Sequence, residues 1–168
     1  MSKLYVAYGS NLNFKQMLAR CPTARFVGVG TIPNYELLFR GGSNCAVATV
    51  EPKEGASVPV GVWRITPQDE VALDRFEGYP SFYEKENVEV RLSNGAIINE
   101  MAYIMTDGHQ FGEPSLYYYQ AILQGYQDCG LDEHILHDYV AQAIELAKEH
   151  QQEIEPEQDD DQQTWSWW

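Results

Sequence analysis

The sequence predicts an α+β fold, in which a mixed, partly closed sheet carries helices packed on its outside. About six strand-like runs come early in the chain, and two long amphipathic helical patterns come late. We see no internal repeat. With 168 residues, 44% of them hydrophobic, the chain fits one domain with a substantial core. We place that domain at residues 1–150.

The first third of the chain favours strands. Alternating apolar residues predict a strand over about 3–8, and a short helix over about 13–19 follows. Residues 25–40 are expected to be extended. The β-branched runs 46–50 and 58–65, separated by a loop with proline and glycine, predict a hairpin-like pair.

The next helix has clear start and stop signals. Thr66 and Asp69 form a capping-box pattern with Pro67 at the first helical position. The helix is expected to run to about Phe76 and to stop at Gly78, because glycine is a common helix terminator.

The rest of the domain is predicted as two strands and two helices. The strands cover about 84–91 and 96–105, and Ser93-Asn94-Gly95 is a strong turn signal between them. A helix opens at Ser115 and ends at Gly130, and Asp132 caps the last one.

From residue 151 to 168 the composition becomes Gln, Glu and Asp, which predicts a flexible acidic tail. It ends in Trp165-Ser166-Trp167-Trp168. These tryptophans either dock into a groove of this chain or of a protein partner, or belong to an unselected terminus.

Charge and cysteine content narrow the function classes. The net charge is −14, and the first 150 residues still carry 19 acids against 11 bases, so we exclude nucleic acid and anionic membranes as primary partners. No apolar stretch is long enough to span a bilayer. The three cysteines lack metal or disulfide spacing, and we expect a cytoplasmic protein.

The turn after the first strand is the first candidate site. Tyr8-Gly9-Ser10-Asn11-Leu12 leads from a strand into a helix, where unpaired N–H groups can hold a carboxylate or an oxyanion. Gly9 lets a ligand approach the backbone, while Ser10 and Asn11 can cap the helix or bond the ligand. A purely structural turn is the alternative.

Glu77 is the candidate titratable group. The helix end near Glu77, and Asp74 one turn earlier, are expected to raise the pKa of its carboxyl. A pocket walled by Tyr79, Phe82 or Tyr83 would raise that pKa further, toward the range useful for proton transfer at neutral pH. The alternative is an ordinary surface glutamate.

Together these segments resemble a known family. Tyr8-Gly9-Ser10-Asn11-Leu12 is similar to the signature loop of the γ-glutamylcyclotransferase-like superfamily, the AIG2-like and butirosin-pathway cyclotransferase group. The same order continues in Tyr35-x-Leu37-x-Phe39, Gly61-Val62-Trp63, Leu73-Asp74-x-x-Glu77-Gly78-Tyr79 and Pro114-Ser115-x-x-Tyr118. The resemblance covers about residues 3–131.

The resemblance implies a small mixed β-barrel flanked by helices and an enzyme without metal or organic cofactor. The implied reaction converts a small-molecule γ-glutamyl substrate to 5-oxoproline and releases an amine or amino acid. Glu77 would be the general acid/base. The loop formed by Tyr8, Gly9, Ser10, Asn11 and Leu12 would bind the glutamyl moiety. Tyr83 and Tyr118 either line the pocket or pack in the core.

Several alternatives remain open at this level. A catalytically inactive interaction module on the same fold is the main competitor. An acyl transfer to an external amine or water lacks an evident nucleophile–base pair. His134 and His137 could be half of a metal site, and a cysteine could be a nucleophile.

Overall fold

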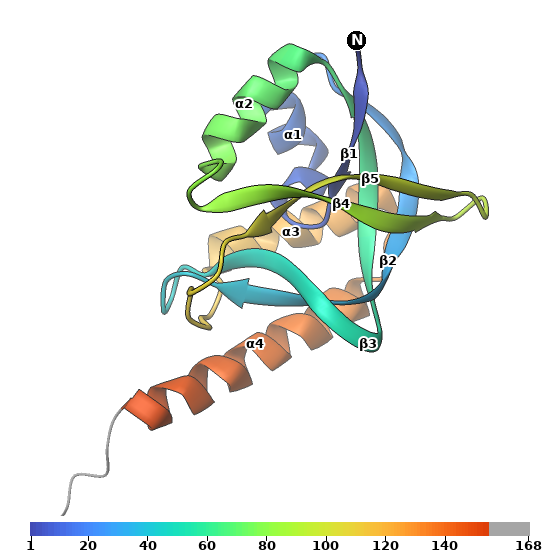
Figure 1. The fold of residues 1–168 in the computed structure, drawn as a ribbon. Coiled ribbons are helices and arrows are strands. Elements are labelled where there is room, and N and C mark those ends of the chain that lie inside the picture. The colour runs from blue at the N-terminus through green and yellow to red at the C-terminus, as the bar shows by residue number, and fades with distance from the viewer. Residues whose placement is uncertain (155–168) are drawn as a thin grey trace, which may run out of the picture.

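The computed structural model describes residues 1–154, which form a five-stranded barrel with helices on its outside (Figure 1). The elements in chain order are β1 (Lys3–Ala7), the 3-10 turn η1 (Ser10–Leu12), α1 (Phe14–Arg20), β2 (Arg25–Arg40), β3 (Val47–Ile65), α2 (Pro67–Glu77), β4 (Tyr83–Leu92), β5 (Ile97–Met105), α3 (Leu116–Cys129) and α4 (Glu133–Ile154).

The predicted α+β class and mixed barrel are confirmed, and the barrel is closed. Its strand order is β1-β3-β2-β4-β5. The pair β1–β5 is parallel and closes the sheet, while the other neighbouring pairs are antiparallel. Strand β1 pairs with β3 on one side and with β5 on the other, so the loop after β1 begins where this strand leaves the barrel wall.

The predicted hairpin between residues 46–50 and 58–65 is wrong. Both runs belong to one long strand, β3, and each pairs with a different half of β2. The intervening Pro/Gly segment bulges opposite Asn34, whose side-chain Oδ1 accepts a hydrogen bond from the backbone N of Gly55 at 3.0 Å. A turn-like composition inside a strand therefore marks a bulge here.

Helix α2 forms as its capping signals predict. The side chain of Thr66 accepts from the backbone N of Asp69, and the side chain of Asp69 accepts from the backbone N of Thr66. At the other end Gly78 adopts φ 65°, the left-handed conformation in which glycine has no steric penalty. These caps fix Glu77 as the last helical residue.

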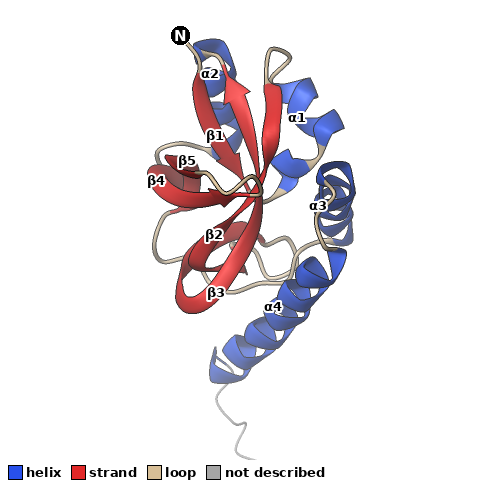
Figure 2. Ribbon diagram, turned by 90° about the vertical axis from the view of Figure 1, so that its right-hand side faces the viewer, coloured by secondary structure: helices blue, strands red, loops and turns tan. Residues whose placement is uncertain are grey.

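The remaining helices lie together. Figure 2 shows α1, α3 and α4 along one side of the barrel. Helix α3 begins at its N-cap Ser115 and ends at Gly130, as predicted. Helix α4 continues to Ile154, beyond the domain boundary expected at residue 150, and the rest of the acidic tail with its tryptophans lies outside the described residues.

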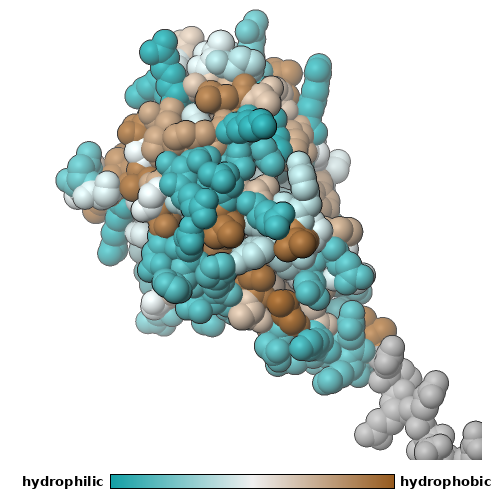
Figure 3. All heavy atoms as spheres, turned by 180° about the vertical axis from the view of Figure 1, so that it is seen from behind, coloured by the Kyte–Doolittle hydropathy of each residue, from teal (hydrophilic) through white to brown (hydrophobic). Residues whose placement is uncertain are grey.

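Hydrophobic side chains gather inside the barrel and under the helices. The largest fully buried side chains include Trp63, Tyr103 and Tyr126. On the face seen in Figure 3, hydrophilic side chains cover most of the surface and hydrophobic ones form small scattered groups. Within residues 1–154, no helix combines the length and the apolar character needed to cross a membrane.

Candidate active site

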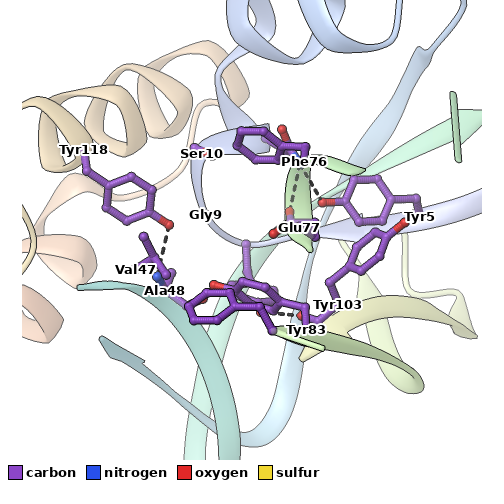
Figure 4. A pocket seen from close by; sticks show the side chains of 13 residues that line it. Tyr5, Gly9, Ser10, Val47, Ala48, Phe76, Glu77, Tyr83, Tyr103 and Tyr118 are labelled. Atoms are coloured by element: carbon purple, nitrogen blue, oxygen red, sulfur yellow. Dashed lines mark hydrogen bonds between the residues drawn. The ribbon is translucent and has the colours of Figure 1, made fainter. Parts of the chain in front are cut away.

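A cavity of about 130 Å³ opens where the end of β1 meets the end of α2 (Figure 4). Its walls come from six parts of the chain and are mostly aromatic. They are formed by Tyr5, Tyr8, Gly9, Ser10, Asn11, Val47, Ala48, Phe76, Glu77, Phe82, Tyr83, Tyr103 and Tyr118.

The loop after β1 turns sharply at the cavity. The backbone N of Leu12 donates to the carbonyl of Gly9 at 3.0 Å, which starts the 3-10 turn. The first N–H groups of such a turn have no acceptor within the turn itself. The indole Nε1 of Trp63 donates to the carbonyl of Asn11 at 3.0 Å and ties the loop to β3.

Glu77 is held at the cavity by the attachment of α2 to the barrel. Lys85 on β4 pairs with Asp74 at 2.9 Å, and the hydroxyl of Tyr103 on β5 donates to Asp74 at 2.6 Å. Lys85 also pairs with Glu70, one turn earlier in α2, at 2.7 Å. These contacts dock the barrel-facing side of α2 onto two strands, so that its last residue reaches the cavity.

The pKa of Glu77 is raised to about 7. Burial raises it by disfavouring the charged carboxylate, and the nearby positive charge of Arg20 lowers it in part. The expected contribution of Asp74 is absent from these causes. Its carboxylate instead pairs with the ammonium of Lys85 and accepts a hydrogen bond from the hydroxyl of Tyr103.

Asn11 links the loop to the carboxyl group. Its amide Nδ2 donates to the hydroxyl of Tyr5 at 3.0 Å and reaches Oε1 of Glu77 at 3.5 Å. Figure 4 shows Glu77 and Tyr5 directed toward the same space from α2 and β1. The two features predicted independently from the sequence, the loop and Glu77, therefore meet in one cavity.

Tyr83 and Tyr118 both line the cavity, and both hydrogen-bond to the backbone of Ala48. The hydroxyl of Tyr83 donates to the carbonyl of Ala48 at 2.6 Å, and the hydroxyl of Tyr118 accepts from the N of Ala48 at 3.0 Å. Burial raises the pKa of both phenols, so they stay protonated at neutral pH. A Cβ on Gly9 would lie 3.2 Å from the Tyr118 hydroxyl, so the loop approaches this tyrosine closely.

Two residues named from the sequence lie elsewhere. Leu12 does not line the cavity: it is fully buried, and it packs so closely against Gly61 and Gly125 that a Cβ at either glycine would come within 3.0 Å of it. It is a core residue, because the turn points its apolar side chain inward. Tyr79, expected as a wall, is 41% exposed and lies over the ammonium of Lys85.

Sequence reasoning did not assign a site role to Tyr5, Ala48 or Tyr103. Tyr5 and Tyr103 are buried residues of β1 and β5. The alternation of apolar residues in a strand does not distinguish a side chain that lines a cavity from one that packs in the core. Ala48 contributes its backbone N–H and carbonyl, and the identity of a side chain does not predict such a role.

No cluster of three or more His, Cys, Asp or Glu side chains suited to a metal ion occurs among residues 1–154. His137, considered as half of a metal site, hydrogen-bonds through Nδ1 to the hydroxyl of Tyr119. Burial raises the pKa of Cys21 to about 11 and of Cys129 to about 12, which keeps both thiols protonated and weakly nucleophilic at neutral pH.

Comparison with known proteins assigns the family. The sequence model of the family described as Gamma-glutamyl cyclotransferase, AIG2-like, matches residues 5–122, which contain the loop, Glu77, Tyr83 and Tyr118. The chain belongs to this family.

Relatives and solved structures agree with that assignment. The chain is 30% identical to gamma-glutamylcyclotransferase of Homo sapiens over 138 residues, covering 77% of this chain and 73% of the relative. It is 31% identical to the Mus musculus protein of the same name over 140 residues, covering 76% and 72%. A solved gamma-glutamyl cyclotransferase, 25% identical, superposes with a TM-score of 0.76 over 89% of this chain and 99% of that one.

Proposed function

We propose that this protein cyclises the γ-glutamyl group of a small substrate to 5-oxoproline and releases an amine or amino acid, with Glu77 as the general acid/base. The observation that carries the proposal is the position of Glu77: a carboxyl with a pKa of about 7 in a small cavity beside the Gly9–Asn11 loop. The relatives' name, gamma-glutamylcyclotransferase, supplies the reaction class.

The chemistry needs one group that both accepts and donates a proton. The α-ammonium of a γ-glutamyl group is not nucleophilic until a base removes a proton. Ionised Glu77 accepts that proton, and the free amine attacks the γ-carbonyl of the same molecule. The new C–N bond closes the five-membered ring. After ring closure the ring nitrogen still carries one proton more than the lactam needs. As the original γ-amide C–N bond breaks, protonated Glu77 returns its proton to the departing nitrogen and the ring nitrogen gives up its extra proton, so the amine leaves as an ammonium and Glu77 is ionised again. A pKa near the working pH suits both steps.

The cavity contributes orientation and charge stabilisation. Because amine and carbonyl belong to one molecule, the enzyme mainly has to hold a cyclising conformer. The backbone N–H groups at the start of the 3-10 turn are the donors proposed to hold the substrate carboxylate or the oxyanion that forms on the attacked carbonyl. The protonated hydroxyls of Tyr83 and Tyr118 close the cavity on the side facing Ala48.

The leaving group is proposed to lie toward two aromatic side chains of the cavity wall. Phe76 is 47% exposed, so it reaches the surface, and Phe82 is partly buried against Tyr83, with ring centroids 5.1 Å apart. The aromatic wall favours leaving groups with an apolar part.

The test is incubation with a panel of γ-glutamyl amino acids and γ-glutamyl amines, with 5-oxoproline measured by mass spectrometry. Wild type should release 5-oxoproline from at least one substrate, and Glu77→Gln should lose on the order of 10²-fold because it keeps the shape but not the proton transfer. Glu145→Gln is the matched control, since Glu145 is a helical glutamate 70% exposed on α4. Equal turnover by wild type and Glu77→Gln contradicts the role of Glu77, and no turnover of any substrate supports the inactive module.

A further inference from the structure

Arg20, the last residue of α1, is held by three contacts next to the cavity. Its Nη1 donates to Oδ1 of Asn11 at 2.7 Å, and its Nη2 donates to Oε1 of Gln16 at 3.1 Å. Its guanidinium carbon lies 3.7 Å from the centre of the Phe76 ring. Arg20 is not one of the residues that line the cavity. A long side chain fixed at three points has lost most of its conformational freedom and acts as a rigid support.

The first contact sets the orientation of the Asn11 amide. Arginine has five donors and no acceptor, so the group of Asn11 that faces Arg20 must be its oxygen. The amide nitrogen then faces the other way, toward the hydroxyl of Tyr5 and the carboxyl of Glu77. The reversed amide would present an oxygen to ionised Glu77 and repel it. Arg20 therefore determines that Asn11 offers Glu77 a donor.

The stacking of Arg20 on Phe76 affects the end of α2. Phe76 directly precedes Glu77, and its ring is the surface on which the guanidinium stacks. A cation over an aromatic face is attractive. The stack joins the C-terminal ends of α1 and α2. It also gives a structural reason for a phenylalanine that is 47% exposed at this position.

The charge of Arg20 acts on Glu77 as well. Burial raises the pKa of Glu77, and the charge of Arg20 lowers it. The other titratable groups whose charges couple to Glu77 are the phenols of Tyr5 and Tyr8 at β1, Tyr83 on β4 and Tyr118 on α3, and burial raises the pKa of each. All four are neutral at neutral pH, so they do not offset the effect of the guanidinium.

We propose that Arg20 is a positioning residue, which orients the Asn11 amide and, through Phe76, the end of α2, so that the Glu77 carboxyl is held in place for proton transfer. Arg20 itself does not contact the substrate in this arrangement. The proposal rests on the proposed function only for its kinetic consequences, since the orientation of Asn11 and the charge on Glu77 are measurable without turnover.

The test separates the charge of Arg20 from its geometry. Glu77 is titrated by ¹³C NMR of the carboxyl carbon in wild type, Arg20→Gln and Arg20→Lys, with its signal assigned by its loss in Glu77→Gln. The Glu77 midpoint should rise by about one pH unit in Arg20→Gln, because an adjacent opposite charge shifts a carboxyl by that order. Arg20→Lys should bring the midpoint back toward that of wild type. Arg25→Gln, an exposed arginine at the start of β2, is the control and should leave the midpoint unchanged.

Kinetics then test the positioning. Lysine keeps the charge but cannot bridge Asn11 and Gln16 while stacking on Phe76, so Arg20→Lys should lose kcat by on the order of tenfold with KM nearly unchanged. In a double-mutant cycle, Arg20→Lys and Asn11→Ala should be strongly non-additive, because both disturb the contact between the Asn11 amide and Glu77.

Three results would overturn the proposal. If the titration midpoint of Glu77 is unchanged in folded Arg20→Gln, the charge of Arg20 does not act on Glu77. If Arg20→Lys has the same kcat as wild type, Arg20 does not position Glu77. Additive losses in the cycle show that Arg20 does not act through Asn11. If Arg20→Gln fails to fold, Arg20→Lys carries the test by itself. If the proposed reaction is not found at all, the titration still decides whether Arg20 controls Glu77.

Discussion

Replacing Glu77 by glutamine is expected to stabilise the protein above neutral pH while it abolishes proton transfer. The folded carboxyl has a pKa of about 7, against an ordinary value of 4.5. Between these two values the folded state keeps the proton and the unfolded state releases it. The stabilising effect of protonation is therefore present at low pH and is lost as the pH rises through about 7.

The magnitude follows from the size of the shift. A difference of about 2.5 pKa units at about 1.36 kcal/mol per unit gives roughly 3 kcal/mol by which ionised Glu77 destabilises the fold at pH 8. This is an upper bound, because solvent reaches part of the side chain and screens the charge. Glutamine has a similar shape and no charge, so it avoids this cost at every pH.

The assay is urea unfolding of wild type, Glu77→Gln and the control Glu145→Gln at pH 5 and pH 8. The free energy of unfolding of Glu77→Gln should exceed that of wild type at pH 8, and the difference should shrink toward zero at pH 5. Other titrating groups are common to all three proteins and cancel in the difference. The reasoning is refuted if wild type and Glu77→Gln respond equally to the change of pH.

Three further substitutions test the site and its support. Gly9→Ala places a Cβ 3.2 Å from the Tyr118 hydroxyl and should lower kcat/KM by about tenfold, because the loop is displaced. The circular dichroism spectrum should stay unchanged, and a wild-type kcat/KM would contradict a close contact between the loop and Tyr118. Thr66→Ala removes the cap of α2 and should lower the free energy of unfolding by about 1 kcal/mol in urea, and no loss would mean that the capping box is not stabilising. Tyr83→Phe removes the 2.6 Å bond to the Ala48 carbonyl and should cost about 1 kcal/mol or more by the same measurement, whereas a neutral effect would show that the carbonyl finds another donor.

Features of the fold that depend only on neighbouring residues could be predicted from the sequence. The ends of α2 follow from Thr66, Asp69 and Gly78, whose effects depend on neighbours within one turn. The hairpin misassignment has the opposite origin: whether residues 51–57 form a turn or a bulge depends on β2, which is distant in sequence and long enough to pair with both halves of β3.

The same division applies to the site. The loop and Glu77 each have a local pattern, and the family resemblance pairs them. The raised pKa of Glu77 was predicted, but part of its expected cause was wrong, since Asp74 faces Lys85 and Tyr103 from neighbouring strands. Arg20 carries no local signal for a site, because its role depends on the meeting of α1 with α2.

The most direct test of the central claim is the pH dependence of kcat/KM for 5-oxoproline release, measured from pH 5 to pH 9. Glu77 must be ionised to accept a proton from the substrate ammonium, so kcat/KM should rise with pH and reach half its plateau at about 7. A profile that is flat across this range, or one already at its plateau at pH 5, would contradict a buried carboxyl with a raised pKa as the proton-transfer group.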